Sequence, residues 1–568
     1  MEGWRAIVEA IKAEEVELVF GLPTSRSLYS FIADVPEVRP ILVRHECSGA
    51  FMAMAYARLS GKPGVCYGSP GPGVVNLVPG INEAYYTCTP VVALGAASSI
   101  KLEGMGEWHD CSELQAGQIS MFKPITKWSV RISHSERLPW AMRRAFSIAA
   151  NGKPGPVFVE IPSDVGLAKV EMPSYTRAIY PLRFTGDHEK VKAAADLIVK
   201  SERPVIVAGG GVVLSGAFQE LIEFAELLAI PVLTTASGRG SIPEDHPLAL
   251  GLVGLYRTKV GKMIYQRSDL LITIGSRNET ESSGNWMYFP ENARYIQIDI
   301  DPFEIGRNWV PDVAIVGDAK LVLRDLISAT SAKIKIKNFE SMPRVKELVR
   351  AKNEFEAEVE AECRTDAIPI KTKRIVRELN KVFGKDTILV NENGCQDLWS
   401  YYCPYYKVLN IGDCIPMDHQ TCMGFGVAAA IGAKLTKPEK KVVCTTGDGA
   451  FQMFMKEMPT AVQYSAPVTW VVLNNFSLGW VKYIQRALNE KYCCVDFESQ
   501  PNFVKLAEAN ACYGERVEKP AEIEVALKNA LKKNKEGIPA VLDCIIDPWD
   551  VAEAFKEFHR EVLNIPVK

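Results

Sequence analysis

Residues 441–477 have the sequence KVVCTTGDGAFQMFMKEMPTAVQYSAPVTWVVLNNFS, which predicts two parallel β-strands joined by a helix. A β-branched run over Lys441–Thr446 predicts the first strand, which stops at Gly447-Asp448-Gly449. Apolar residues at near-helical spacing predict a helix from Ala450 to about Tyr464. A second apolar run, Val468–Leu473, predicts the second strand, and Asn474-Asn475 follows it. This strand–helix–strand order is typical of an α/β fold.

The polar residues that follow the two strands predict a cation site. Parallel strands end at the same edge of a sheet, where α/β proteins bind ligands, so we expect Asp448 and Asn475 to be neighbours. With the backbone carbonyl of Ser477 they offer oxygen ligands that suit Mg²⁺, which takes further oxygens from a phosphorylated ligand. Gly447 and Gly449 let the backbone approach such a ligand, and the following helix N-terminus favours a diphosphate.

The spacing of GDG and NN resembles the thiamine diphosphate (ThDP) fingerprint. The surrounding sequence most resembles the acetolactate synthase branch of the 2-oxoacid decarboxylase and carboligase superfamily, and the resemblance runs from Phe20 to Pro548. It implies that Asp448, Asn475 and Ser477 hold Mg²⁺, which in turn holds the cofactor's diphosphate. The same resemblance implies cofactor contacts by Gly447, Asp448, Gly449, Ala450, Asn475, Ser477, Leu478 and Gly479.

Length and composition indicate a large globular chain without a nucleic-acid or membrane partner. At 568 residues the chain exceeds a single core, so three domains are the natural expectation. Net charge is −3, and no apolar run reaches membrane-spanning length. The first residues lack a signal-peptide pattern, and the 14 cysteines form no CxxC pair. Reduced thiols and a cytoplasmic location are therefore expected.

Near the amino terminus, Arg44-His45-Glu46 follows a predicted strand, and Glu46 begins the helix ECSGAFMAMAYARLSG. The pattern resembles the family's catalytic glutamate, which drives the aminopyrimidine of ThDP to its imino tautomer in a proton relay. The alternative is an ion pair between Glu46 and Arg44. The later loop GSPGPGVVN resembles the family's SGPGxxN element and implies that Gly71 and Asn76 lie near the pyrimidine.

Three further polar residues are candidates for contact with substrate. Ser25 follows a βα turn, and a serine faces the active site at the matching place in some relatives; the alternative is a helix N-cap. The segment LQAGQISMFKPITKW resembles one in which a glutamine touches substrate, and both Gln115 and Gln118 are candidates.

In the carboxyl-terminal third, the resemblance implies three more cofactor contacts. Gln396 follows the predicted strand Thr387–Val390 and is the expected phosphate donor. The stretch QTCMGFG resembles GxMGFG, in which the methionine, here Met423, bends the cofactor into a V shape. Thr421 stands where relatives have a glycine whose carbonyl receives the 4′-amino group, and a backbone role survives that substitution.

The predicted fold class is α/β, with three doubly wound parallel-sheet domains. The expected ranges are 1–174 for a pyrimidine-binding domain with the ThDP-binding fold, 186–330 for a Rossmann-like middle domain and 366–550 for the diphosphate- and Mg²⁺-binding domain. Relatives bind FAD, ADP or nothing in the middle domain. GGGVVLSG is not GxGxxG, and Glu281 replaces an arginine of the flavin-bearing synthases, so FAD or ADP is not favoured.

The resemblance implies an enzyme that decarboxylates a 2-oxo acid such as pyruvate and transfers the acyl unit to a carbonyl acceptor. Alternatives on the same cofactor are a 2-hydroxyacyl-CoA lyase, an oxalyl-CoA decarboxylase-like enzyme or an aldehyde lyase. A non-catalytic nucleotide-binding relative is the alternative from another class. The superfamily builds its sites from two subunits, so a homodimer or homotetramer with shared active sites is expected.

Overall fold

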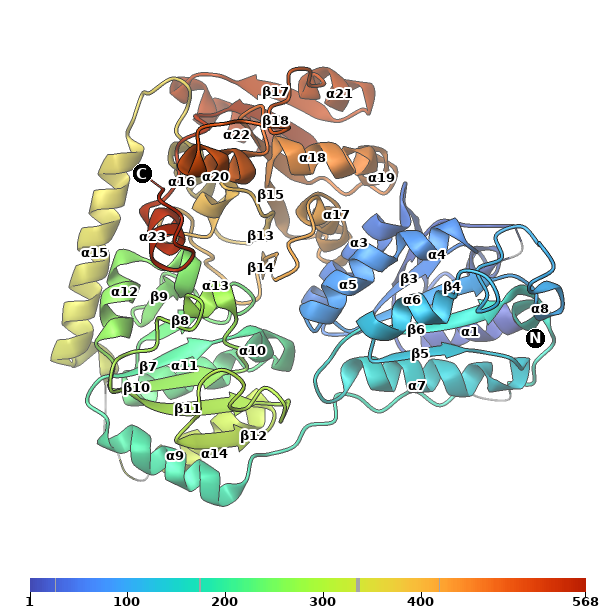
Figure 1. The fold of residues 1–568 in the computed structure, drawn as a ribbon, viewed down its shortest axis with the longest axis horizontal. Helices are drawn as coiled ribbons and strands as arrows, with labels where there is room; N and C mark the ends of the chain where they lie inside the picture. The colour runs from blue at the N-terminus through green and yellow to red at the C-terminus, as the bar shows by residue number, and fades with distance from the viewer. Residues whose placement is uncertain (26, 173–174, 332, 334–337, 418, 568) are drawn as a thin grey trace. The chain divides into compact units, whose positions relative to one another are not determined.

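The computed structural model describes residues 1–25, 27–172, 175–331, 333, 338–417 and 419–567. Its described chain contains three six-stranded sheets in which every strand pair is parallel (Figure 1). This arrangement confirms the predicted fold class. The inner strands of each sheet are buried along most of their length, as expected for parallel strands covered by helices on both faces.

The first sheet has the strand order β2-β1-β3-β4-β6-β5. Its strands are β1 (Leu18–Gly21), β2 (Arg39–Leu42), β3 (Gly64–Gly68), β4 (Val91–Ala97), β5 (Trp128–Arg131) and β6 (Val157–Pro162). Its flanking helices are α1 (Gly3–Ala13), α2 (Leu28–Ile32), α3 (Glu46–Ser60), α4 (Pro72–Asn76), α5 (Val78–Tyr86), α6 (Gln118–Phe122), α7 (Leu138–Ala150) and α8 (Ser163–Leu167).

The second sheet has the order β12-β11-β10-β7-β8-β9. Its strands are β7 (Pro204–Ala208), β8 (Val232–Thr234), β9 (Ala249–Leu252), β10 (Leu270–Ile274), β11 (Arg294–Asp299) and β12 (Val313–Val316). Its helices are α9 (His188–Lys200), α10 (Gly210–Ser215), α11 (Phe218–Leu228), α12 (Lys259–Gln266), α13 (Thr280–Ser283) and α14 (Ala319–Ser331).

The third sheet has the order β14-β13-β15-β16-β18-β17. Its strands are β13 (Thr387–Asn391), β14 (Cys414–Ile415), β15 (Lys441–Gly447), β16 (Thr469–Asn474), β17 (Tyr513–Val517) and β18 (Ala540–Ile545). The helices of this part of the sequence are α15 (Pro343–Cys363), α16 (Thr372–Phe383), α17 (Phe425–Thr436), α18 (Asp448–Phe454), α19 (Met458–Gln463), α20 (Gly479–Leu488), α21 (Phe503–Ala509), α22 (Ile523–Lys535) and α23 (Glu553–Glu561).

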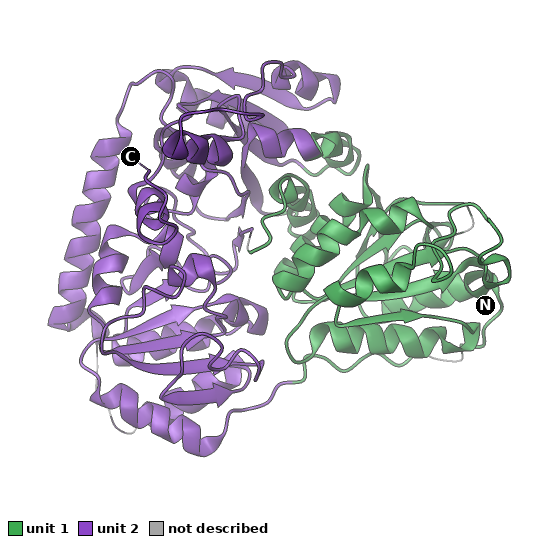
Figure 2. Ribbon diagram, viewed as in Figure 1, with its two compact units in different colours: residues 1–182, 419–439, 454–466 green, residues 183–418, 440–453, 467–568 purple. Residues whose placement is uncertain are grey.

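Contacts group the chain into two compact units, shown in Figure 2. Unit 1 comprises residues 1–182, 419–439 and 454–466, and unit 2 comprises residues 183–418, 440–453 and 467–568. Each predicted domain range holds one sheet, although residue 174, the predicted end of the first, lies outside the described residues. The three ranges stay a prediction, because helices α17 and α19 group with the first sheet rather than the third.

Helices α3 and α17 of unit 1 pack against each other, and small residues let their backbones approach closely. A Cβ added to Gly432 of α17 would lie 2.6 Å from the carbonyl oxygen of Met52 in α3. Phe51 of α3 contacts Phe425 edge-on, with ring centroids 5.3 Å apart. Nearly all of α3 is therefore buried, and its first residue, Glu46, is held in the interior of the unit.

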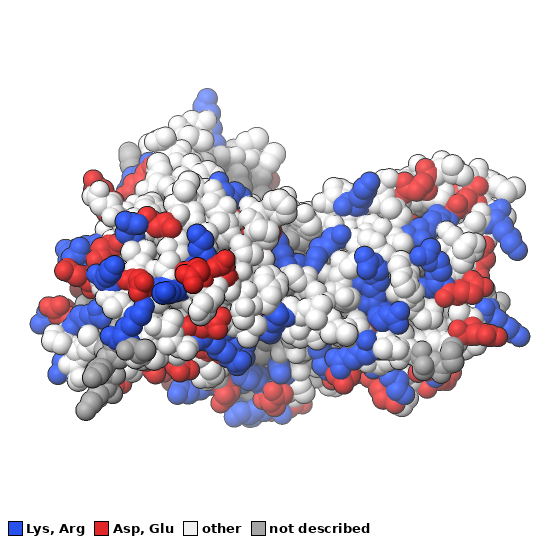
Figure 3. Space-filling view, turned by 90° about the horizontal axis from the view of Figure 1, so that it is seen from below, with Lys and Arg blue, Asp and Glu red and all other residues white. Residues whose placement is uncertain are grey.

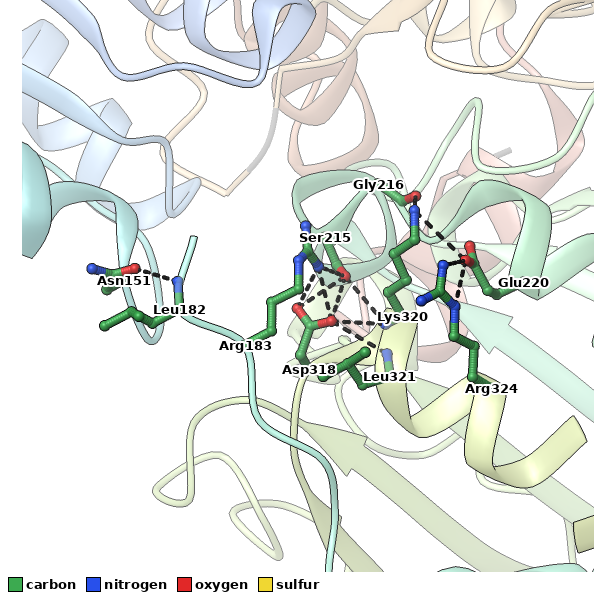
Figure 4. A network of polar contacts seen from close by, with 10 residues as sticks. All are labelled: Asn151, Leu182, Arg183, Ser215, Gly216, Glu220, Asp318, Lys320, Leu321 and Arg324. Carbon is green, nitrogen blue, oxygen red and sulfur yellow. Dashed lines mark hydrogen bonds and ion pairs between the residues drawn. The ribbon is translucent and has the colours of Figure 1, made fainter. Parts of the chain in front are cut away.

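Residues 175–187, between helices α8 and α9, have no regular secondary structure. Within unit 1 the backbone N–H of Leu182 donates to Asn151 Oδ1 at 2.7 Å. In unit 2 the guanidinium of Arg183 contacts both carboxylate oxygens of Asp318 at 2.8 Å and Ser215 Oγ at 2.7 Å (Figure 4). Leu182 and Arg183, on either side of the unit boundary, are therefore each held by polar contacts within their own unit.

The helix predicted from Ala450 to about Tyr464 is interrupted. The structure has α18, a 3₁₀ turn at Met455–Glu457 and then α19. Pro459 lies in the first turn of α19, where its missing N–H costs no hydrogen bond, but it cannot continue a helix from the preceding residues. The prediction of a single helix was therefore wrong.

Charged residues pair with one another along the surface. Helix α15 buries Val345, Leu348, Val359 and Cys363. Its Glu356 and Glu360 pair with Arg377 of α16 at 3.1 and 3.0 Å. On the face seen in Figure 3, basic and acidic side chains are interspersed. Among the described residues we find no helix with the length and apolar character needed to cross a membrane.

Candidate active site

In unit 2, strands β15 and β16 bring the two polar motifs together at one edge of the third sheet. The pairing is parallel, with Gly447, the last residue of β15, opposite Leu473 of β16. Asp448 and Asn474 are the next residues along each strand, and Asn475 follows. The structure therefore places the GDG and NN motifs side by side, as the sequence predicted.

Asp448 is a buried carboxylate whose contacts are polar but uncharged. Its side chain is 1% exposed, and Oδ2 accepts a hydrogen bond from Gln500 Nε2 at 2.7 Å. No cationic side chain of the described chain forms an ion pair with it. Burial raises the pKa of Asp448 to about 7, because desolvation disfavours the ionised form. An ionised carboxylate in this position would be stabilised by a bound cation.

Asn475 and Ser477 form a small hydrogen-bonded turn beside this carboxylate. The N–H of Ser477 donates to Asn475 Oδ1 at 3.1 Å, and Asn475 Nδ2 donates to Gln396 Oε1 at 2.9 Å. Gln396 Nε2 in turn donates to the carbonyl of Pro548 at 2.8 Å. Gln396, the predicted phosphate donor, therefore also orients the amide of Asn475.

Glycines shape the rest of this edge. A Cβ added to Gly447 would meet nothing within 4 Å, so open space lies beside the start of α18. At Gly479, by contrast, a Cβ would lie 2.4 Å from Gln396 Oε1 and 2.5 Å from Asn475 Nδ2. Gly449 and Ala450 lie buried in the first turn of α18. The backbone N–H groups of a first helical turn have no acceptor within the helix and can bind a ligand at its N-terminus. Leu478, half-buried, donates its N–H to the carbonyl of Val495 at 2.8 Å.

In unit 1, Glu46 lies at the first position of α3 and is 3% exposed. Asn76 Nδ2 donates to Glu46 Oε2 at 3.0 Å, and Ser69 Oγ lies 3.4 Å from Oε1. A Cβ on Gly73 would lie 2.6 Å from Oε1, so a glycine there leaves room for the carboxyl. The loop thus positions the carboxyl with two side-chain donors, and no ion pair of Glu46 occurs among the described residues.

The proposed ion pair between Glu46 and Arg44 is absent from the described contacts. The Arg44 guanidinium donates to Gln463 Oε1 at 2.8 Å and to the carbonyl of Leu42 at 3.2 Å. His45 caps α3, its Nδ1 accepting from the N–H of Cys47 at 3.3 Å. Burial lowers the pKa of His45, so its ring is neutral at pH 7.

Gly71 and Thr421 both have backbone conformations in the left-handed region, with φ of 68° and 51°. Such a conformation is common for glycine and strained for a β-branched residue. Thr421 stands where the resemblance expects a glycine, and it keeps the glycine-like backbone. Gly424, at φ 89°, could not carry a side chain, because its Cβ would lie 2.0 Å from the ring of Phe454. Met423, between Thr421 and α17, is half-buried.

The structure separates the two candidate glutamines. Gln115 is exposed, whereas Gln118 begins α6 and is fully buried. Neither polar atom of the Gln118 side chain has a hydrogen-bond partner within the described chain. Ser25 is exposed and is not the N-cap of the next helix; Ser27 holds that position. The N-cap alternative for Ser25 was therefore wrong.

Family models match three segments that together cover most of the chain. Residues 1–117 match the N-terminal TPP binding domain of thiamine pyrophosphate enzymes, residues 191–326 match the central domain, and residues 392–544 match the C-terminal TPP binding domain. The chain belongs to the thiamine pyrophosphate enzyme family. This confirms the resemblance stated from the sequence, and with it an enzyme that uses ThDP.

Curated members of the thiamine pyrophosphate enzyme family align with nearly the whole chain. A probable acetolactate synthase large subunit of Methanococcus aeolicus is 38% identical, over 96% of this chain and 92% of the relative. The corresponding protein of Methanocaldococcus jannaschii is 39% identical over the same shares. Acetolactate synthase isozyme 3 large subunit of Escherichia coli is 30% identical, over 96% and 95%.

The described residues fit ThDP and a divalent cation. Among them no three His, Cys, Asp or Glu side chains form a metal cluster; the sheet edge carries a carboxylate at Asp448 and an amide at Asn475. The Asp448 carboxylate is buried and has no cationic partner among the described residues. When bound, ThDP supplies a nucleophilic thiazolium carbon that adds to carbonyl groups and stabilises the resulting carbanion.

Sequence reasoning missed the residues that form hydrogen bonds with Asp448 in unit 2 and with Glu46 in unit 1. Gln500 joins Asp448 to Asn474, whose Nδ2 donates to Gln500 Oε1 at 2.9 Å. Ser69 contacts Glu46 but was passed over within its loop. No local signal identifies Gln500, which lies in the irregular segment between α20 and α21. Trp480 and Tyr483 of α20 pack against Phe555 of α23.

Proposed function

We propose that this protein is an acetolactate synthase-like carboligase that uses ThDP and Mg²⁺. It would decarboxylate a 2-oxo acid such as pyruvate and transfer the acyl unit to a carbonyl acceptor. The observation that carries the proposal is the Asp448, Asn475 and Ser477 set at one sheet edge of a chain whose full-length relatives are named acetolactate synthases.

In this proposal the chain's own residues have separate tasks. Asp448, Asn475 and the Ser477 carbonyl hold the cation, and the first turn of α18 with Gln396 receives the diphosphate. Glu46, held by Asn76 and Ser69, donates and accepts the proton at the pyrimidine nitrogen. Thr421 offers its carbonyl, and Met423 supports the bent cofactor. Gly71 allows close approach of the loop.

The substrate contacts and the assembly are part of the same proposal. Gln115, Gln118 and Ser25 remain the candidates for contact with substrate, and Gln118 reaches it only if α6 moves, because its amide is buried. We place the enzyme in the cytoplasm as a homodimer or homotetramer. Each active site would combine the Glu46 half of one subunit with the Asp448 half of another.

A product assay tests the function. Purified protein with ThDP and Mg²⁺ is supplied with pyruvate, and both CO₂ and acetolactate are measured. We expect the two products in equal amounts, since each carboligation releases one CO₂. Release of CO₂ with free acetaldehyde in place of acetolactate would contradict the transfer step and indicate a decarboxylase. Absence of both CO₂ and acetolactate would overturn the whole proposal.

A further inference from the structure

The loop that follows α20 returns to pair with the segment carrying the predicted metal-ligand carbonyl. Leu478 N–H donates to the Val495 carbonyl at 2.8 Å, and Phe497 N–H donates to the Phe476 carbonyl at 2.9 Å. Between them, Ser477 and Asp496 form an antiparallel bridge. A short two-stranded ribbon therefore fixes Ser477, and one of its strands begins directly after Cys494.

Cys493 and Cys494 are the exposed cysteines among the 14 of this chain, all of which lie in its described part. The Cys493 S–H donates to Cys494 Sγ at 3.8 Å. Gln485 of α20 holds the backbone of Cys493 on both sides, accepting from its N–H at 2.9 Å and donating to its carbonyl at 3.2 Å. Cys494 has a φ of 55°, in the left-handed region. The two thiols thus face one another on an accessible loop.

We propose that Cys493 and Cys494 form a redox-active dithiol site that reacts with low-molecular-weight disulfides. One thiolate attacks a sulfur of the small disulfide, forming a mixed disulfide and releasing one small thiolate. The neighbouring cysteine then attacks the protein sulfur of that mixed disulfide, forming the Cys493–Cys494 bond and releasing the second small thiolate. The two cysteine protons end on the two released thiols, and the small disulfide takes up the two electrons.

The geometry makes this bond reversible. Adjacent Cα atoms are about 3.8 Å apart across a trans peptide bond, below the range of about 4.4–6.8 Å usual for disulfides. A bond between neighbours is therefore strained, and strained, exposed disulfides are readily reduced. A pair of this kind is suited to sensing the thiol–disulfide balance rather than to stabilising the fold.

Closing the ring changes the backbone where the ribbon begins. The dihedral angles of Cys493 and Cys494 must shift, and Val495 and Asp496 follow directly. These two residues pair with Leu478 and Ser477, so oxidation alters the position of the Ser477 carbonyl. This link to cation binding rests on the proposed function, whereas the dithiol itself does not.

The dithiol is tested by mass spectrometry on the reduced full-length protein with ThDP and Mg²⁺, using oxidised glutathione as the disulfide. We expect loss of two hydrogens with no retained glutathione, and both sulfurs in one linked peptide; dithiothreitol should reverse the change. Cys493→Ser and Cys494→Ser should each stop at the mixed disulfide and retain one glutathione. The matched control Cys111→Ser, in a loop of unit 1, should behave as the unaltered protein.

Two results would overturn the site: both thiols staying free, or a stable glutathione on each cysteine of the unaltered protein. Oxidation is scored by mass alone, so a failed product assay does not affect it. The link to the metal is read from the Mg²⁺ concentration that half-saturates ThDP binding, followed by tryptophan fluorescence. We expect a several-fold increase on oxidation, absent in Cys494→Ser; an unchanged concentration would overturn that link.

Discussion

Glu46 combines deep burial with two neutral donors, an environment suited to a carboxyl group that exchanges a proton with a ligand. Glu46→Gln preserves the shape of the side chain and an oxygen that can accept a hydrogen bond from Asn76. The amide, however, cannot take up or release a proton as a carboxyl group does. We expect kcat to fall by about 10²–10⁴-fold, the usual contribution of general acid–base catalysis, with the fold unchanged. Steady-state kinetics and circular dichroism measure both. The exposed Glu17→Gln is the matched control, and a Glu46→Gln enzyme of near-normal kcat would exclude the proton-transfer role.

Asp448 makes the stability of the metal-free protein depend on pH. Burial raises the pKa of Asp448 to about 7 in the folded state, whereas an unfolded aspartate titrates near 4. A raised pKa stabilises the fold at low pH, and that stability is lost as pH rises through about 7. We therefore expect the contribution of Asp448 to the metal-free protein's free energy of unfolding to decrease between about pH 4 and 7.

Asp448→Asn should remove this decrease and stabilise the metal-free protein at pH 8 by on the order of a few kcal/mol. It should also abolish the stabilisation that ThDP and Mg²⁺ give the unaltered protein. Urea unfolding with and without the ligands, at pH 5 and pH 8, measures both effects. Asp245→Asn, an exposed aspartate away from the sheet edge, is the control. Equal pH dependence of Asp448→Asn and the unaltered protein would contradict this account.

Thr421 has a β-branched side chain on a left-handed backbone with φ of 51°. Such a residue carries about 1–3 kcal/mol of strain, more than the entropy cost of glycine. Thr421→Gly should therefore raise the melting temperature by a few degrees, which calorimetry can measure. In the regular helix α17, Thr436→Gly should lower it. A lower melting temperature for Thr421→Gly would show that the threonine side chain stabilises the turn.

At the scale of elements, the close approach of α3 and α17 holds Glu46 in place. Gly432→Ala would bring a methyl group to 2.6 Å from the Met52 carbonyl and force the helices apart. We expect a loss of about 1–3 kcal/mol in unfolding free energy, from denaturant titration. Gly394→Ala, whose Cβ would find its nearest neighbour at 4.0 Å, is the matched control and should change little. Equal effects of the two substitutions would argue against tight packing as the cause.

At the scale of the whole molecule, the proposed shared active site predicts complementation between subunits. Glu46→Gln and Asp448→Asn each disable one half of a site, so each variant alone should be nearly inactive. When the subunits of the two variants are dissociated, mixed and reassembled, activity should return. One of the two sites of each hybrid dimer then combines two unaltered halves. Activity is compared with that of each variant reassembled alone. No recovery, despite hybrids confirmed by native mass spectrometry, would place both halves in one subunit.

Much of this architecture follows from local sequence patterns. Continuous apolar runs ending in GDG and NN predicted β15 and β16 and the edge at which Asp448 and Asn475 meet, because parallel strands leave little choice of geometry. Glu46 was identified from the residues around it, and its position at the start of α3 is a local property of the chain. The prediction of a single helix over residues 450–464 was wrong, because it relied on apolar periodicity and did not account for Pro459.

Only the tertiary structure decided which hydrogen-bond and packing partners these residues and elements have. Gln500 reaches Asp448 from a distant irregular segment, Arg44 turns to Gln463 rather than to Glu46, and α17 packs with the first sheet. The same holds for Gln118, which is buried while Gln115 is exposed. Side-chain chemistry and spacing determine which elements form and which residues can react. Long-range packing then selects each partner, because hydrogen bonds and close contacts depend on distances that spacing along the chain does not set.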